Sequence, residues 1–310
     1  MSTSIGAGAV PSSGTGLPRV PNLKHKSRPL ESAIRATLML SAFLSVAITF
    51  GIIVALIRPV IDFFEEVPFG RFFSTEAEYG VLPLVAGTAM TTVIALLVAV
   101  PLGLGAAMYL SEYASRRARK ILKPTVELLA GVPSVVYGFF ALSFVTPTLL
   151  QDLLNLDVNF TNALSAGLVL GVMIIPTIAS LSEDALSAVP QAMRQGSLAM
   201  GANRMQTTLR VVFPAALSGV AAAIVLGMSR AVGETMIVAL AAGSQKNLTF
   251  DPREGMQTMT GFMARTAGGE NPVGSTSYNT LFAVGMLLFV ITFVINVISI
   301  ALVRRFRQVY

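Results

Sequence analysis

Arg230 and Glu234 are the residues whose types and spacing point most directly to chemistry in this sequence. Both interrupt a long apolar run over residues 220–242. On a helix, a spacing of four residues places two side chains on one face, close enough to pair. Charged side chains at bilayer depth are costly, so they face the interior of a helix bundle or a water-filled path. The two residues predict either a structural ion pair that locks two helices or part of an anion pathway, and the remaining sequence favours the pathway.

Three further polar residues are candidates for the same pathway. Glu127 lies in the third apolar segment, where we expect a second buried carboxylate, either an alternative partner for Arg230 or a clasp between helices. Gly and Pro residues interrupt that segment over 131–138, and broken helices commonly line cavities in membrane proteins. Ser134 and Thr235 offer hydroxyl donors to a passing anion, although such hydroxyls often bond only to the backbone.

The elements that must position these residues are helices in a membrane. Of the 310 residues, 54% are hydrophobic and only 12% are charged, whereas a soluble domain carries about 25% charged residues. There is no Cys, and the single His25 lies in a polar N-terminal segment, so we expect no metal site, no cofactor and no His-dependent catalysis. Glu127 and Glu234 could form the carboxylate pair of an intramembrane enzyme, but no nucleophile or metal cluster accompanies them.

The sequence predicts an all-α integral membrane protein with six transmembrane helices. Six apolar segments are each long enough to cross a hydrocarbon core of roughly 30 Å. The predicted spans are about 35–58, 82–110, 122–147, 162–182, 212–242 and 278–303. We expect residues 31–310 to form the transmembrane domain, and the Gly-, Ser- and Pro-rich residues 1–30 to form a disordered tail.

The distribution of basic residues predicts the orientation of these spans. Of the 22 Lys and Arg residues, 16 lie in the two terminal segments and the second and fourth loops, five lie in the other loops, and Arg230 lies within a span. Because loops rich in Lys and Arg stay in the cytoplasm, both termini are predicted to be cytoplasmic. This topology explains the net charge of +6 without nucleic acid, which we do not expect as a partner.

The fourth loop, about 183–213, is predicted to present a rigid docking surface to the cytoplasm. Pro190 can begin a helix at its first turn. Gly201 permits a sharp bend at little steric cost. Pro214 is expected to close the segment where the chain enters the membrane. The pattern predicts a short helix, a bend and a second short helix, on which a soluble partner could dock.

Residues in this loop match the spacing of the EAA motif of ABC-importer permeases. In that family, Glu-Ala-Ala is followed by three residues, Gly, nine residues, Ile, one residue and Leu-Pro. Here Gln195, Gly196 and Ser197 occupy the first positions, Gly201-Ala202 the centre, and Val211, Phe213 and Pro214 the end. Gln in place of Glu weakens any salt-bridge role at position 195, whereas the helix–Gly–helix shape is unaffected.

Three longer stretches, 123–138, 172–186 and 229–238, resemble the PstC family of phosphate ABC-transporter permeases. The sister PstA family is similar but fits these stretches less well. The resemblance covers residues 70–305, approximately, with the three motifs in the family's order. It implies the MetI-like permease fold of type I ABC importers, in a bacterial inner membrane.

The resemblance also implies partners. They are a second, PstA-like permease, two PstB-like ATPase subunits, an external PstS-like phosphate-binding protein, and membrane lipid. The chain has no Gly-X-X-X-X-Gly-Lys-Ser/Thr loop to hold ATP, so we expect no enzyme activity of its own, and motion from the ATPase would enter through the loop around Gly201. Two alternatives are a permease for another oxyanion, such as sulfate or molybdate, and a phosphate-sensing membrane scaffold with little flux.

Overall fold

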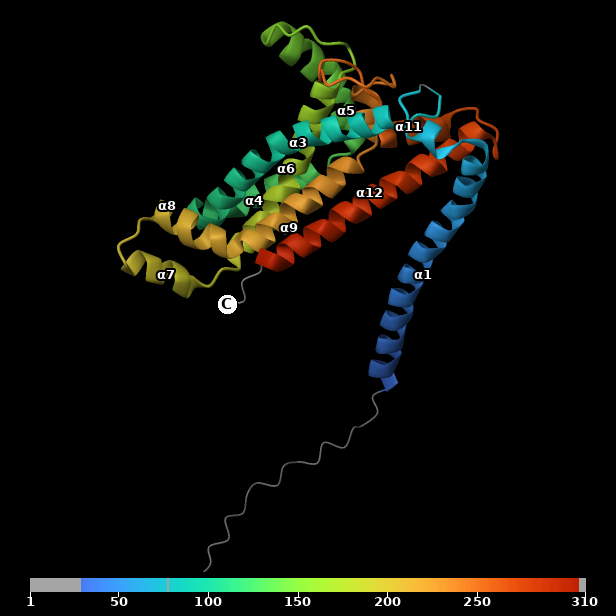
Figure 1. Cartoon of the computed structure of the whole chain (residues 1–310). Helices are drawn as coiled ribbons and strands as arrows, with labels where there is room; N and C mark the ends of the chain where they lie inside the picture. The colour runs from blue at the N-terminus through green and yellow to red at the C-terminus, as the bar shows by residue number, and fades with distance from the viewer. Residues whose placement is uncertain (1–28, 77, 307–310) are drawn as a thin grey trace, which may run out of the picture. The chain divides into compact units, whose positions relative to one another are not determined.

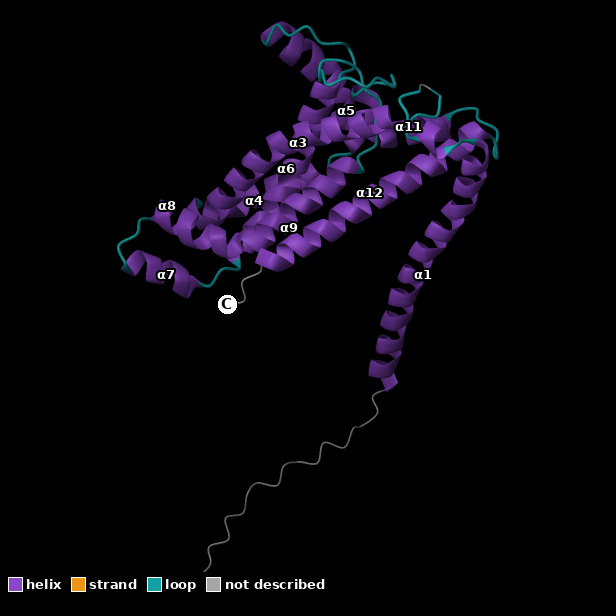
Figure 2. Ribbon diagram, in the orientation of Figure 1, coloured by secondary structure: helices purple, strands orange, loops and turns teal. Residues whose placement is uncertain are grey.

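A computed structural model describes residues 29–76 and 78–306, and the regular secondary structure of this part of the chain is all helical, with loops between the helices and no strand (Figures 1 and 2). His25 and nearly all of the predicted tail over residues 1–30 lie outside the described residues. The α-helices are α1 (Pro29–Glu66), α2 (Phe69–Phe72), α3 (Leu82–Met108), α4 (Arg116–Ala130), α5 (Ser134–Phe140), α6 (Ala163–Ser187), α7 (Gln191–Ala199), α8 (Arg204–Thr207), α9 (Phe213–Val232), α10 (Met236–Ala241), α11 (Met259–Gly268) and α12 (Thr276–Phe306). Three π-helical segments continue them, namely η1 (Tyr109–Tyr113), η2 (Ala141–Leu153) and η3 (Thr208–Val212).

The chain divides into two compact units, residues 1–54 and 55–310. The described part of the first unit is the N-terminal portion of α1. The second unit contains the rest of α1 and all the other helices, including every residue considered below as a candidate for function.

Six helical stretches of the described chain are long and apolar enough to cross a membrane, as predicted. They are Leu30–Glu66, Leu82–Tyr113, Ser134–Leu153, Ala163–Ser187, Arg204–Val232 and Thr276–Ala301. Two predicted boundaries are wrong by ten residues or more. The third span begins at Ser134 rather than at 122, and the fifth ends at Val232 rather than at 242.

The third span is shorter than predicted because the chain breaks at Gly131–Pro133. Proline has no backbone N–H, and its ring keeps the preceding residue out of the helical conformation. The stretch before the break is therefore a separate helix, α4. Ser115 caps its N-terminus, since the Ser115 side chain accepts a hydrogen bond from the backbone N–H of Ala118 at 3.2 Å. No described residue of α4 is buried.

Helix α6 is the centre of the second unit, and α3 and α9 run beside it (Figure 1). Glycines allow the close approach. A Cβ atom on Gly167 of α6 would lie 2.6 Å from the Cβ of Ile94 in α3, and one on Gly227 of α9 would lie 2.8 Å from Cγ1 of Ile178 in α6. Small residues are the usual means by which membrane helices pack tightly. Helices α3, α6 and α9 thus form a closely packed core, and this core positions the polar residues described below.

Candidate functional site

The fifth apolar segment is broken beside its two ionisable residues. Helix α9 ends at Val232 and α10 begins at Met236, so the predicted continuous helix over 212–242 is wrong. The Glu234 carboxylate accepts hydrogen bonds from the backbone N–H groups of Met236, at 3.1 Å, and Ile237, at 3.4 Å. The first N–H groups of a helix have no partner within it, so the carboxylate stabilises the start of α10.

The predicted pairing of Arg230 with Glu234 is also wrong, since no ion pair joins them in the described structure. The four-residue rule applies within one helix, and Glu234 lies beyond the end of α9. Arg230 instead donates from Nη1 to Oγ1 of Thr177 in α6, at 3.2 Å. Thr177 lies near the middle of α6, so this contact holds the guanidinium well inside the length of a neighbouring span. The Arg230 side chain is exposed in this chain, which leaves its other donors accessible.

Glu127 is not the buried carboxylate that the sequence predicts. It lies on α4, before the break at Gly131–Pro133 and outside the third span, and its side chain is exposed. Among the described residues it forms no ion pair with Arg230. Gly131 and Pro133 mark this break in the sequence, but the predicted span over 122–147 continued through it and so placed Glu127 inside a span.

Ser134 and Thr235 lie at the two helix breaks, and the helices that follow these breaks pack together. Ser134 is the first residue of α5, and Thr235 directly precedes α10. A Cβ atom on Gly138 of α5 would lie 2.7 Å from Cδ1 of Leu240 in α10, so this glycine allows close packing. Both hydroxyl-bearing residues are partly buried. The structure thus brings together two interruptions that are about a hundred residues apart in the chain.

The loop between α6 and α9 has the predicted helix–bend–helix shape. Helix α7 follows Pro190, the chain turns at Gly201, and α8 follows. Gly201 has a φ of +88°, in the left-handed region that favours glycine, and its N–H donates to the carbonyl of Leu198 at 3.0 Å. A Cβ atom at Gly201 would meet nothing within 4 Å, so the requirement for glycine comes from the backbone alone.

The predicted end of this loop at Pro214 is not observed. Helix α8, η3 and α9 follow one another without a gap, and Pro214 lies in the first turn of α9. The π-helical segment η3 directly precedes the proline, and such segments accommodate a local change in the backbone hydrogen-bond ladder. The second arm of the loop is therefore rigidly continuous with the fifth span.

Apolar side chains are exposed around the bend. Met200 is 89% exposed, and Leu198 and Met205 are also exposed. Gln195 and Gly196 lie exposed on α7, Ala202 is partly buried, and Ser197 turns toward α8, where its hydroxyl lies 2.9 Å from that of Thr207. Clustered exposed apolar residues usually mark a surface that another protein covers.

A buried arginine of α7, Arg194, anchors this helix to the rest of the protein. No sequence pattern had indicated this role. The Arg194 guanidinium donates to the Glu112 carboxylate from Nε, at 3.2 Å, and from Nη2, at 2.9 Å. It also donates to the backbone carbonyls of Leu186, at 2.7 Å, and Val189. Arg194 is the one buried residue of α7. The contacts of the Arg194 guanidinium therefore hold α7 in place, whereas buried apolar side chains usually hold such a helix.

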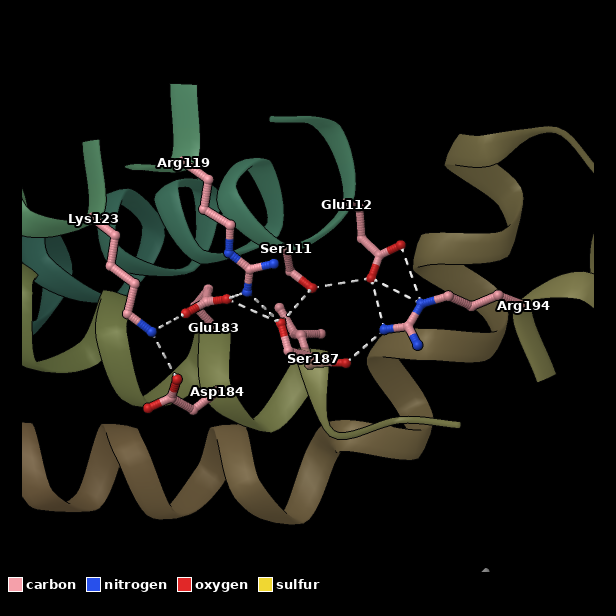
Figure 3. Close-up of polar contacts among 9 residues, drawn as sticks. Ser111, Glu112, Arg119, Lys123, Glu183, Asp184, Ser187 and Arg194 are labelled. Atoms are coloured by element: carbon pink, nitrogen blue, oxygen red, sulfur yellow. Dashed lines mark hydrogen bonds and ion pairs between the residues drawn. The ribbon is translucent and has the colours of Figure 1, made fainter. Parts of the chain in front are cut away.

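A second centre of charge lies on α6 and α4 (Figure 3). The Glu183 side chain is fully buried, and its carboxylate pairs with Lys123 at 2.6 Å and with Arg119. Lys123 also pairs with the neighbouring Asp184, at 2.9 Å, but the Asp184 side chain is 61% exposed. An acidic residue directly after an apolar span, on the side rich in Lys and Arg, was the sequence signal for this centre.

Two serines join the two centres. Ser187 donates to Glu183 at 2.9 Å and lies 3.5 Å from the hydroxyl of Ser111, which in turn donates to Glu112 at 3.0 Å (Figure 3). We call the whole set the charge linkage. Its members are Ser111, Glu112, Arg119, Lys123, Glu183, Ser187 and Arg194. A polar cavity of about 340 Å³ opens beside it.

At the other end of α6, polar contacts stabilise the long loop between α10 and α11. Hydrogen bonds from Arg253 to the Asp251 carboxylate lower the pKa of that carboxyl to about 2. Lys246 donates to the backbone carbonyl of Glu78 at 2.9 Å and lies over the ring of Phe262, and burial lowers the pKa of this lysine. These contacts fix the loop and bring no further group to the two helix breaks.

Comparison with protein families matches residues 99–308 to the binding-protein-dependent transport system inner membrane component family. Among similar proteins, a probable ABC transporter permease protein of Bacillus subtilis, YqgH, is 38% identical over 219 residues, covering 71% of this chain and 70% of the relative. The phosphate transport system permease protein PstC of Haemophilus influenzae is 30% identical over 304 residues, covering 90% and 95%. PstC 1 of Mycobacterium tuberculosis is 36% identical over 250 residues, covering 74% and 73%.

Solved structures with a similar fold come from ABC transporters. An inward-facing structure of the MetNI methionine ABC transporter gives a TM-score of 0.54 at 21% identity, covering 74% of this chain and 95% of the other. A bacterial alginate ABC transporter in complex with its periplasmic protein gives 0.64 at 16% identity, covering 91% and 99%. At these identities the likeness concerns the fold, which is that of MetI-type permeases.

Proposed function

From its membership of the binding-protein-dependent transport system inner membrane component family, we propose that this chain is a permease subunit of an ABC-type importer of inorganic phosphate. The observation that carries the proposal is the exposed Arg230, which is hydrogen-bonded to Thr177. The relatives of this chain include phosphate permeases at 30–36% identity. The helical fold with six apolar spans supports the same conclusion.

Arg230 supplies the chemistry that phosphate passage needs. A phosphate dianion that loses its water requires a positive charge and several hydrogen-bond donors. The guanidinium is a planar fork of five donors that stays charged at every working pH. Since Glu234 caps α10 and does not pair with Arg230, the arginine has donors available for an anion.

The remaining pathway residues have unequal parts in this proposal. Ser134 and Thr235, at the two helix breaks, are hydroxyl donors near the route, and broken helices are where polar backbone can line a path. Glu234 positions the break and does not neutralise the arginine. Glu127, exposed on α4, is available to a second permease subunit and is not the partner of Arg230.

ATP hydrolysis is assigned to partner chains. The surface around Gly201, with Gln195, Gly196, Ser197, Ala202 and the segment leading to Pro214, is proposed to dock an ATPase subunit and receive its motion. The exposed Leu198, Met200 and Met205 support a protein partner there. A second permease of the same fold completes the pathway, and an external phosphate-binding protein delivers the anion.

Reconstitution tests this proposal. We expect the chain to co-purify with an ATPase and a phosphate-binding protein, and the complex in liposomes to hydrolyse ATP when phosphate is present. Sulfate and molybdate serve as competing anions in the uptake assay. Displacement of phosphate by either anion would reassign the substrate, and phosphate-dependent signalling without flux would instead indicate a membrane scaffold.

The orientation in the membrane is a second proposal. The protein crosses the membrane several times, and we propose that both termini are cytoplasmic because 16 of the 22 Lys and Arg residues fall on that side. A reporter enzyme that is active only outside the cytoplasm, fused after Tyr310, should give no signal. The same reporter placed in the loop between α10 and α11 should be active, and a strong signal from the Tyr310 fusion would contradict this topology.

A further inference from the structure

The charge linkage joins α7 to elements that are distant in sequence. Arg194 and Glu112 are separated by 82 residues, and Lys123 and Glu183 by 60. Figure 3 shows the side chains meeting in one row, from Lys123 and Arg119 of α4, through Glu183 and Ser187 of α6, to Glu112 of η1 and Arg194 of α7. The row therefore connects α7 to α4 through η1 and α6.

Burial makes this connection stiff. The Arg194 and Glu112 side chains are 11% and 9% exposed, and Glu183 is fully buried. A buried charge that loses its partner is strongly destabilising, so these groups stay together when the elements move. The two hydrogen bonds between the guanidinium and the carboxylate add a fixed orientation, which a point contact lacks.

Helix α4 leads from the charge linkage to the candidate pathway. It ends at Ala130, next to the break at Gly131–Pro133, and α5 follows immediately. Helix α5 packs on α10, which begins after the break between Val232 and Met236. A continuous physical route thus runs from the docking helix to both helix breaks.

We infer that Glu112, Arg194 and Glu183 are positioning residues that transmit the movement of α7 to α4 and so couple ATP hydrolysis to phosphate passage. The inference rests on the proposed docking of an ATPase at α7. Arg194 and Glu112 line one cavity together with the exposed Gln195 and Leu198, and Glu183 is fully buried. The three residues therefore connect the proposed docking surface with the interior.

The measurement is the number of phosphate ions transported per ATP hydrolysed, in liposomes that contain the complete importer. Glu112→Gln and Glu183→Gln keep the shape of each side chain and remove its charge. We expect both variants to bind the ATPase subunit in normal amounts and to hydrolyse ATP, but to lower the transport ratio roughly two- to thirtyfold, the range for residues along a coupling route.

Asp184→Asn provides the matched control. Asp184 is adjacent to Glu183 and pairs with the same lysine, but its side chain is largely exposed, where ion pairs contribute little. This variant should keep the wild-type ratio. In a double-mutant cycle, Glu112→Gln and Arg194→Gln should lose less together than the sum of their separate losses, because either change breaks the same contact.

The outcomes separate the inference from the proposed function. Failure of the wild-type chain to recover an ATPase would refute the docking proposal itself. Normal recovery with a wild-type transport ratio in both Gln variants would overturn the coupling role. Should these variants not accumulate in the membrane, Glu112→Asp and Arg194→Lys keep the charges and change only the geometry, and a wild-type ratio in both would equally overturn it.

Discussion

Replacement of Arg230 by alanine is expected to remove most phosphate uptake while the importer still assembles. Hydrogen bonds to charged groups contribute about 1.5–3 kcal/mol. Loss of that stabilisation corresponds to a decrease in rate of roughly ten- to more than a hundredfold. The side chain is exposed and makes a single hydrogen bond to another side chain in the described structure, so its removal should cost the fold little.

Uptake of radiolabelled phosphate at matched membrane levels measures this effect. Arg230→Lys should restore part of the activity, since an ammonium keeps the charge but lacks the planar fork of donors. Arg58→Ala, which removes an exposed arginine of α1, is the matched control and should transport normally. Uptake at the wild-type rate by Arg230→Ala would show that the arginine only ties α9 to α6 through Thr177.

Replacement of Gly201 by valine is expected to prevent docking of the ATPase while the permease remains in the membrane. A left-handed backbone conformation costs residues with a Cβ atom about 1–2 kcal/mol, and β-branched residues are especially disfavoured there. The resulting change in the equilibrium between the bent and relaxed loop is roughly five- to thirtyfold. The Cβ position is open, so any effect arises from the backbone and not from a clash.

A pull-down of the ATPase subunit measures docking. Gly201→Asn should retain most of it, because asparagine tolerates the left-handed region better than other residues with a side chain. Gly105→Ala is a matched control away from this surface, since Gly105 lies within α3 and a Cβ atom there meets nothing within 4 Å. If Gly201→Val recovered as much ATPase as the control does, the bend at Gly201 would not be required for docking.

Local patterns explain why much of the architecture was predictable. Six apolar stretches predict six spans because the thickness of the bilayer sets the length of each helix. The bend at Gly201 and the start of α7 after Pro190 were predictable for a similar reason, since backbone freedom at Gly and Pro is a property of the residue itself. The two wrong span boundaries lie where a break interrupts an apolar run without changing its hydrophobicity.

The candidate site was only partly predictable. Arg230 is easily recognised as a charge within an apolar run. Its hydrogen-bond partner, however, is Thr177 of α6 and not Glu234, because α9 ends before Glu234 and the two residues do not share one helical face. For Glu127, the sequence predicted the wrong degree of burial. Its position in an apolar-looking segment suggested burial, whereas the structure exposes it on a separate helix.

The sequence by itself determined the class of protein, the number of spans and the shape of the loop between α6 and α9, since each follows from composition or from residues adjacent in the chain. Only the tertiary structure decided which charges meet. Lys123 and Glu183 come together because α4 packs on α6, and Glu112 meets Arg194 because the Arg194 side chain reaches from α7 to η1. The paired residues are 60 to 82 positions apart, so their pairing depends on that packing and cannot be predicted from a periodic pattern in the sequence.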